Sequence, residues 1–357
     1  QNNFPWQLIT YPNVSKEPIK PNLQKRFFQN LLFTFLASTG IVILKDNLEN
    51  YFHSPYEVKA LLNKEILGSI PYLTNISEIT GKSKIYKFEE KEENLSRKEI
   101  LKINKEKRNI YSFKESFKFL VNSLTLQKKS KNIKLLNFTS TVQGEDKTQT
   151  SIELAKMLNK MSKKTLLIDA DLRKPKIHKR LSLNNDIGLS SLFSYESENF
   201  KKLIQDINEF PNLKIITAGP IIEDPYRIFN STKFEDFIIW LRSLEEYEYI
   251  LFDSAQSLFI ADTNLLNNKV DYSILIVSLF KVNKDLIQES ISNIKLSDGE
   301  ILGVITVNTK DNELIGYNYG INAYTYGYGY EDYLNNDNFL ENIYKNLKQF
   351  FKNLFNF

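Results

Sequence analysis

The chain of 357 residues contains no cysteine and only two histidines, His53 and His178. The absence of cysteine excludes disulfide bonds and cysteine-ligated metal sites, and two histidines this far apart argue against histidine-based zinc chemistry. The formal net charge of +4 is small for this length, which argues against a general nucleic-acid-binding protein. The length allows one large α/β domain with additional segments, and the first residue, Gln1, suggests a fragment or a processed chain.

An apolar run without charge covers residues 27–44, and residues 1–26 before it are polar and contain four prolines. We expect the first 26 residues to form an extended lead-in. At about 1.5 Å per residue, a helix over the run is near the lower limit for crossing a hydrocarbon layer of about 30 Å. Gln29, Asn30 and Thr34 weaken it, so these residues fit a membrane-spanning helix and a buried core helix equally well. The flanking charges do not decide an orientation.

Residues 45–109 combine a short helix signal with a charged stretch. Ser54 followed by Pro55 is typical of a helix start, and the apolar stretch 65–71 comes next. Residues 81–109 hold ten Lys and Arg against six Glu and few apolar residues. This stretch predicts a solvated linker; the alternatives are an exposed helix and a surface that lies near anionic lipid.

From about residue 110 onward, short apolar runs of strand length alternate with helical periods. The runs cover residues 135–139, 165–169, 213–217, 249–253, 272–279 and 301–307. Nearly continuous apolar strands that alternate with helices predict an α/β fold in which helices cover both faces of a mostly parallel sheet. Ligands of such sheets bind at the carboxyl ends of the strands.

Three segments at predicted strand ends point to one phosphate site. Residues 139–148, TSTVQGEDKT, predict a phosphate-binding loop, in which backbone N–H groups and a helix N-terminus face phosphate oxygens. Lys147 would reach the terminal phosphates, and the Thr148 hydroxyl would bind Mg²⁺. The residues predicted to bind the nucleotide are Gly144, Glu145, Asp146, Lys147, Thr148, Gln149 and Arg173.

The other two segments supply aspartates. Asp169 ends one predicted strand, with Asp171 two residues further on, and Asp253 ends another. Because the carboxyl ends of parallel strands meet at one edge of the sheet, we expect these carboxylates to lie beside the loop. Asp253 would complete the metal shell. The predicted metal ligands are thus Thr148, Asp171 and Asp253.

Asp146 stands where phosphate loops usually have glycine. Aspartate tolerates unusual backbone angles better than most residues, but its charge would lie near phosphate. Two unit charges about 4 Å apart repel by roughly 4 kcal/mol at an effective dielectric of about 20, which corresponds to about a thousandfold in affinity. We therefore expect weakened nucleotide binding unless Lys147 or Mg²⁺ compensates.

The segment 313–335 is rich in tyrosine, glycine and asparagine. Its composition fits a low-complexity tail or a flexible set of phosphoryl acceptors, and behind an ATP site we favour acceptors. The predicted acceptors are Tyr317, Tyr319, Tyr324, Tyr326, Tyr328, Tyr330 and Tyr333. Residues 336–357 then predict a basic amphipathic helix, which would pack on the domain or lie on a membrane surface.

Together these motifs resemble the bacterial tyrosine autokinases that act as polysaccharide co-polymerases, the chain-length regulators of capsule and exopolysaccharide export. LLIDADLRKP at residues 166–175 is nearly the family's Walker A′ motif, and residues 135–148 match its Walker A region. The segments IGL at 187–189 and TAGP at 217–220 also fit. The resemblance covers nearly the whole chain. It implies that residues 27–44 cross the membrane, with residues 1–26 outside and a juxtamembrane segment over residues 45–109.

The resemblance also implies a P-loop tyrosine kinase domain over residues 110–312 that uses ATP and Mg²⁺. The implied catalytic residues are Asp169, which would accept the tyrosine proton, Asp171 and Lys147. The tyrosine tail would be phosphorylated in a neighbouring subunit of a homo-oligomer. The implied location is the inner (plasma) membrane of a bacterial cell with the kinase domain in the cytoplasm. The implied partners are polysaccharide polymerase and export machinery and a tyrosine phosphatase.

The chain departs from the family pattern at several positions. Gln143 and Asp146 replace a proline and a glycine of the loop, and SAQ at 254–256 replaces T-P-P. The family's Glu-Arg-Arg oligomerisation motif is represented by Glu115, Lys118 and Val121. Our hypothesis is a tyrosine autokinase that regulates surface polysaccharide. The alternatives are a co-polymerase scaffold with a degenerate ATP site and a partitioning-type P-loop ATPase.

Overall fold

The computed structural model describes residues 23–48, 50–71 and 97–308. The chain divides into two compact units, residues 1–50 and 51–357, which are described separately. The predicted tyrosine tail (313–335), the predicted C-terminal helix (336–357) and most of the predicted lead-in (1–26) lie outside the described residues.

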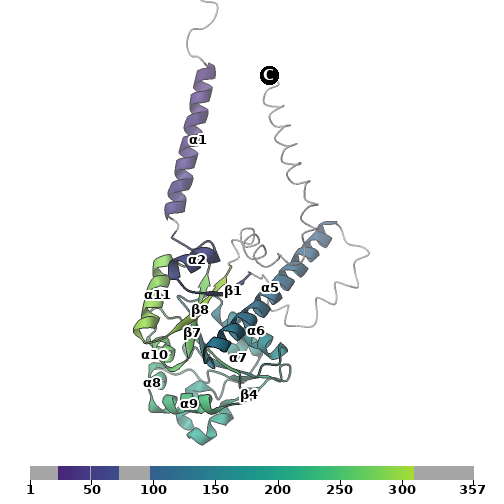
Figure 1. Cartoon of the computed structure of the whole chain (residues 1–357), viewed down its shortest axis with the longest axis vertical. Coiled ribbons are helices and arrows are strands. Elements are labelled where there is room, and N and C mark those ends of the chain that lie inside the picture. Colours follow the sequence, from purple (N-terminus) through teal and green to yellow (C-terminus); the bar gives the residue numbers. More distant parts are fainter. Residues whose placement is uncertain (1–22, 49, 72–96, 309–357) are drawn as a thin grey trace, which may run out of the picture. The chain divides into compact units, whose positions relative to one another are not determined.

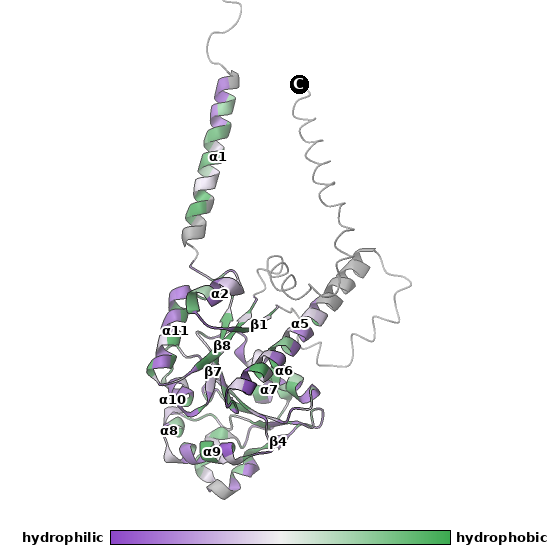
Figure 2. Cartoon of the chain, in the orientation of Figure 1, coloured by the Kyte–Doolittle hydropathy of each residue, from purple (hydrophilic) through white to green (hydrophobic). Residues whose placement is uncertain are grey.

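The first unit contributes one long helix, α1 (Leu23–Leu48). Its apolar run is interrupted by hydroxyl groups that bond back to the helix, such as Thr34 to the Asn30 carbonyl at 2.7 Å and Thr39 to the Phe35 carbonyl at 2.8 Å. Figure 2 shows the same alternation of apolar and polar residues along α1. Among the described residues, no helix combines the length and the apolar character that crossing a membrane requires. The predicted helix is thus confirmed, and its crossing of a membrane stays a prediction.

The second unit is built on an eight-stranded sheet (Figure 1). Its strands are β1 (Ile66–Ile70), β2 (Leu135–Ser140), β3 (Thr165–Ala170), β4 (Gln205–Asp206), β5 (Leu213–Ile216), β6 (Tyr249–Ser254), β7 (Tyr272–Ser278) and β8 (Ile301–Val307). They lie in the order β1-β8-β7-β2-β6-β3-β5-β4, and every neighbouring pair is parallel except β4 with β5. The predicted mostly parallel sheet is confirmed.

Helices cover both faces because successive strand residues point to opposite sides. On one face, α5 (Arg97–Ser130) and α6 (Lys147–Lys160) bury side chains such as Phe117 and Leu158 against Leu136 and Leu251. The other face is covered by α8 (Tyr226–Phe229), α9 (Thr232–Ser243), α10 (Ala261–Lys269), α11 (Lys284–Leu296) and α2 (Pro55–Leu62). Short helices α7 (Ile177–Leu181), η2 (Leu189–Ser194) and η3 (Ser197–Leu203) complete the unit.

All six strands predicted from apolar runs are present, with bounds that differ by one residue or less. Strands β1 and β4 were not predicted as strands. β4 has only two residues, too few for a pattern, and β1 lies in the range 45–109 that was interpreted as a segment outside the domain. Because β1 pairs with β8, and the predicted helix start at Ser54 caps α2 beside it, the second unit begins well before residue 110.

Helix α5 explains one departure from the family pattern. Lys118 forms an ion pair with Glu115 on the exposed side of the helix. Val121, at the position of the motif's last arginine, is only 2% exposed and belongs to the hydrophobic core. In this chain, therefore, Val121 packs the domain and has no surface to offer a neighbouring subunit.

The family-like segments at 187–189 and 217–220 lie in close backbone contact, which glycine at position 188 permits. Leu189 and Ser190 donate backbone hydrogen bonds to the Thr217 and Ala218 carbonyls, both at 2.8 Å. A Cβ on Gly188 would lie 2.2 Å from the Thr217 oxygen, so only glycine allows this approach. The two segments thereby form one support beside β3 and β5.

Gly188→Ala should lower the free energy of unfolding by at least about 2 kcal/mol, because backbone atoms must move to admit the methyl group. Urea unfolding of the full chain measures this loss. Gly68→Ala is the matched control, since a Cβ there would meet its nearest atom at an ordinary 3.6 Å. Equal stability of the two variants would contradict the packing described here.

Candidate active site

The sheet order brings the three predicted site segments to one edge. β2 lies between β7 and β6, and β6 lies between β2 and β3. The loop that follows β2 and the ends of β6 and β3 are therefore neighbours. Asp169 and Asp253 are paired in the register of β3 and β6. The predicted meeting of these segments is confirmed at the level of the backbone.

The loop between β2 and α6 has the backbone that a phosphate loop requires. Gly144 and Asp146 both adopt the left-handed conformation, with φ of 85° and 55°. Asp146 is exposed, stands at the N-cap of α6, and makes no side-chain cap hydrogen bond. The expectation that aspartate tolerates the backbone angles of the missing glycine is thus confirmed. Such a conformation is unfavourable for residues other than glycine by roughly 1–2 kcal/mol.

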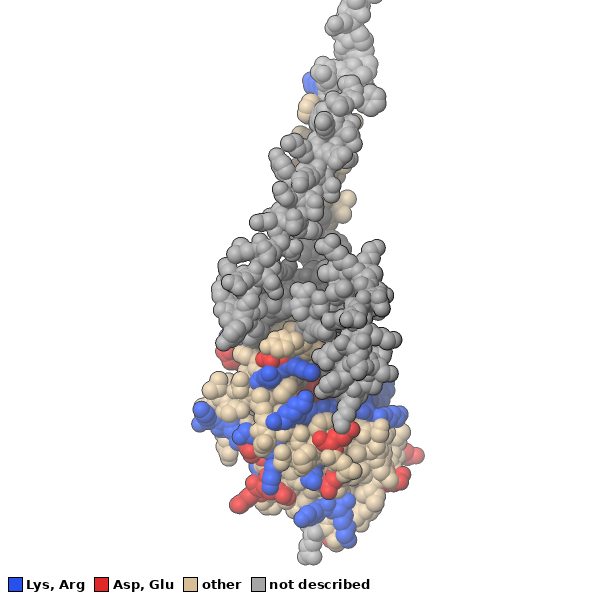
Figure 3. Space-filling view, turned by 90° about the vertical axis from the view of Figure 1, so that its right-hand side faces the viewer, with Lys and Arg blue, Asp and Glu red and all other residues tan. Residues whose placement is uncertain are grey.

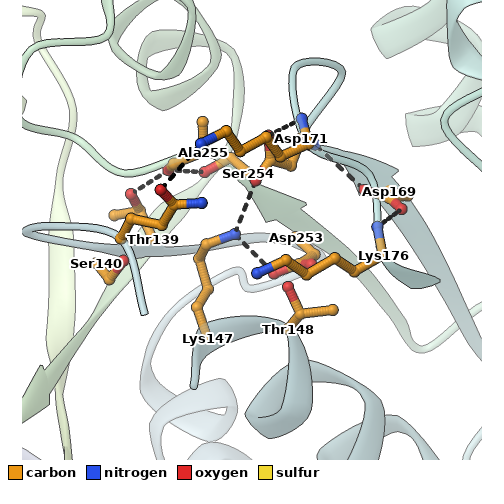
Figure 4. Close-up of polar contacts among 12 residues, drawn as sticks. Thr139, Ser140, Lys147, Thr148, Asp169, Asp171, Lys176, Asp253, Ser254 and Ala255 are labelled. Carbon is orange, nitrogen blue, oxygen red and sulfur yellow. Dashed lines mark hydrogen bonds and ion pairs between the residues drawn. The ribbon is translucent and has the colours of Figure 1, made fainter. Parts of the chain in front are cut away.

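Lys147 is the central cation of the site. Its side chain, only 9% exposed, points between two aspartates, with Nζ 3.2 Å from Asp253 Oδ1 and 3.7 Å from Asp171 Oδ2 (Figure 4). A buried ammonium group requires such partners because desolvation strongly disfavours an unpaired charge. Lys147 therefore draws the loop and both strand ends together.

Asp169 lies beneath these groups and is fully buried. Its Oδ2 accepts hydrogen bonds from the backbone N–H groups of Lys176 at 3.2 Å and Ile177 at 3.0 Å. Burial, reinforced by the charge of Asp253, raises the pKa of Asp169 to about 8. The carboxyl group therefore holds its proton at neutral pH in the free protein.

Asp253 is the second fully buried carboxylate, and burial raises its pKa, although Lys147 and a hydrogen bond with Thr148 oppose the rise. Its Oδ2 makes no hydrogen bond among the described residues. Those residues contain no group of three or more His, Cys, Asp or Glu that forms a complete metal cage. A site of two carboxylates and one hydroxyl instead fits Mg²⁺, which usually keeps waters and binds substrate phosphates.

Some predicted nucleotide-binding side chains have other partners here. Arg173 forms two hydrogen bonds with Asp262, at 2.7 and 3.1 Å. Gln149 bonds to Arg180 and to Glu153. The Glu145 carboxylate lies buried behind the loop. The structure thus brings Lys147, Thr148, Asp169, Asp171 and Asp253 together, and it directs the side chains of Glu145, Gln149 and Arg173 elsewhere.

Two lysines that were not predicted form hydrogen bonds with the phosphate-binding loop. Lys174 Nζ lies 3.1 Å from the Gln143 side-chain oxygen, and Lys281 Nζ donates to the Gly144 carbonyl. The basic run 173–176 could have indicated Lys174. Lys281 lies far from the loop in sequence and gave no signal. Elsewhere, on the side that Figure 3 shows, the Lys and Arg of the described residues are interspersed with Asp and Glu.

The raised pKa of Asp169 has a consequence for stability. Its folded-state pKa of about 8 exceeds the ordinary 3.8, so between these pH values the folded protein retains a proton that the unfolded chain has lost. Stability from this group is therefore full below about pH 4 and is lost as pH rises through 8. In metal-free buffer, the free energy of unfolding should fall with pH more steeply in the wild type than in Asp169→Asn, by up to about 1.4 kcal/mol per pH unit. Parallel urea-unfolding profiles between pH 5 and 8 would contradict this.

Comparisons with known proteins agree with the fold. Residues 130–296 match the AAA domain family. The chain is 30% identical over 196 residues to the tyrosine-protein kinase YwqD of Bacillus subtilis (strain 168), a match that covers 54% of this chain and 79% of YwqD. It is 29% identical over 181 residues to the tyrosine-protein kinase CpsD of Streptococcus pneumoniae, covering 50% of this chain and 78% of CpsD. The kinase domain of the Escherichia coli tyrosine kinase ETK shares the fold, with a TM-score of 0.56 at 20% identity over 75% of this chain and 96% of that domain.

Proposed function

Given that this chain belongs to the bacterial tyrosine-protein kinase family, we propose that it is an ATP-dependent tyrosine autokinase that regulates polymerisation and export of a surface polysaccharide. The observation that carries the proposal is the buried Lys147 held between Asp253 and Asp171 at the strand ends. This cation lies at the start of α6, where the helix N-terminus favours phosphate. The polysaccharide role, the phosphatase partner and the inner-membrane location are supported by the family resemblance.

The phosphate loop would bind ATP through its backbone N–H groups and Lys147. In the free protein Lys147 neutralises Asp253, so it is already oriented toward the place of the terminal phosphates. Transfer of the γ-phosphoryl group needs mainly positioning and charge neutralisation. Lys147 would supply the charge neutralisation once its ammonium group turns from Asp253 to the terminal phosphates.

Mg²⁺ fits beside the loop, where Thr148, Asp171 and Asp253 would hold it and where it would neutralise charge on the phosphates. The buried Oδ2 of Asp253, which has no hydrogen-bond partner among the described residues, supports this assignment. Asp171, with a side chain that is 15% exposed, lies nearer to solvent than Asp253.

Asp169 is the proposed base that accepts the proton of the acceptor tyrosine. With a pKa of about 8 the carboxyl group is protonated at neutral pH in the free protein, so the charge of bound Mg²⁺ would have to lower this pKa before Asp169 could accept the tyrosine proton. Its Oδ2 is held by two backbone N–H groups, whereas among the described residues Oδ1 accepts only a longer bond of 3.3 Å from Asp171 N. Oδ1 is therefore the oxygen available to the hydroxyl group. The proposed acceptors are the seven tyrosines of residues 317–333, presented by another copy of the chain.

The second candidate is a scaffold without kinase activity, favoured by Asp146 in the phosphate loop. Incubation of the full chain with Mg²⁺ and labelled ATP separates the two. We expect label on tyrosines 317–333, and a loss of at least about a hundredfold in Lys147→Ala and Asp169→Asn, because each removes a group that acts on the transferred phosphoryl or the acceptor. Labelling that survives both substitutions would refute the site. ATP binding without any labelling would favour the scaffold.

Asp146→Gly should tighten binding of Mg²⁺–ATP by at least about tenfold, because it removes both a charge near phosphate and a strained left-handed residue. Calorimetric titration of the full chain gives the Kd values. Asp146→Asn is the matched variant, since it removes the charge and retains the strain. Its Kd should therefore lie between that of the wild type and that of Asp146→Gly. Unchanged Kd values in both variants would show that Asp146 does not limit nucleotide binding.

A further inference from the structure

Glu145 is the one acidic residue of the phosphate loop that is buried, with 1% of its surface exposed. Its Oε1 accepts a hydrogen bond from Val142 N at 2.8 Å, within the loop itself. Its Oε2 accepts one from Ser278 N at 2.9 Å, at the end of β7. A single carboxylate therefore joins two segments that are separated by more than a hundred residues in the sequence.

Lys281 makes a second tie between the same segments. Its Nζ donates to the Gly144 carbonyl, and its positive charge favours the ionised form of Glu145. Burial has the larger effect, and the pKa of Glu145 is raised to about 7. Burial disfavours the ionised carboxylate, and the hydrogen bonds that it accepts from backbone N–H groups offset this cost. These bonds are therefore structurally important.

The next residue in the chain is Asp146, which holds a left-handed conformation and makes no side-chain cap hydrogen bond to α6. A glycine would adopt this conformation without strain. The bonds of Glu145, together with that of Lys281 to Gly144, hold the loop on the N-terminal side of Asp146. On the other side, Thr150 N bonds to the Asp146 carbonyl at 2.9 Å and fixes the start of α6.

We propose that Glu145 is a positioning residue: its buried carboxylate fastens the phosphate loop to the end of β7, with Lys281 as a second tie, and so holds Asp146 in its left-handed conformation. The side chain of Glu145 faces away from the nucleotide and acts on ATP only through the shape of the loop. The proposal deepens the proposed function. Only its test by ATP binding rests on that function, whereas the test of loop structure does not.

The first test is independent of nucleotide. In Glu145→Gln, one oxygen can still accept a hydrogen bond, but the amide group faces an N–H donor. Hydrogen–deuterium exchange of the full chain should be faster by at least about tenfold in peptides that contain Val142 and Ser278. Glu153→Gln is the matched control, since Glu153 bonds to Gln149 and Lys156 along α6 and not to the loop. Its exchange at these two sites should equal that of the wild type.

Lys281→Met keeps the test decisive if Glu145→Gln does not fold, because Lys281 is exposed. It should raise exchange in the same peptides by about twofold to fivefold. If Glu145→Gln folds and its peptides exchange at the wild-type rates, the proposal is overturned. If only Lys281→Met folds, wild-type exchange rates in Lys281→Met overturn it.

The second test measures the Kd for Mg²⁺–ATP in a double-mutant cycle. Glu145→Gln should weaken binding by about tenfold in the wild type, but by only about twofold when Asp146→Gly is also present, because glycine needs no support. Equal effects in both backgrounds would overturn the link to Asp146. If no variant and not even the wild type binds ATP, the proposed function fails, while the exchange result still decides whether Glu145 fastens the loop.

Discussion

The buried ion pair of Lys147 with Asp253 is the interaction on which the site depends. It exists because β2 and β6 are adjacent and parallel, so that the loop after β2 and the last residues of β6 meet at one edge. Neither charge is stable in the interior alone. Together they keep a cation at the N-terminus of α6, and the register partner of Asp253, Asp169, is forced into the same low-dielectric region. Its raised pKa follows from that placement.

The part of this arrangement that rests on backbone geometry could be predicted from the sequence. Nearly continuous apolar strands indicated a parallel sheet, and a parallel sheet brings strand ends together. This was enough to place Lys147, Asp171 and Asp253 near one another without any knowledge of distances. The left-handed conformation of Asp146 could also be anticipated, because the pattern of a phosphate loop requires glycine at that position.

What could not be predicted depends on side-chain contacts between distant segments. No local pattern shows that Arg173 pairs with Asp262, or that Glu145 turns inward to meet β7. Membership of β1 in the sheet depends on its pairing with β8, which lies more than two hundred residues further along the chain. Val121 is a further example. The sequence shows only that valine stands where the family's motif has arginine, and the burial of Val121 shows that it belongs to the core.

The most direct test of the account is a structure of the full chain with Mg²⁺ and a non-hydrolysable ATP analogue. The account predicts that Lys147 Nζ leaves Asp253 for the terminal phosphates, and that the metal ion lies between Thr148 and the carboxylates of Asp171 and Asp253. A structure in which the analogue is bound elsewhere, or in which Lys147 keeps its ion pair with Asp253 while the analogue occupies the loop, would contradict it.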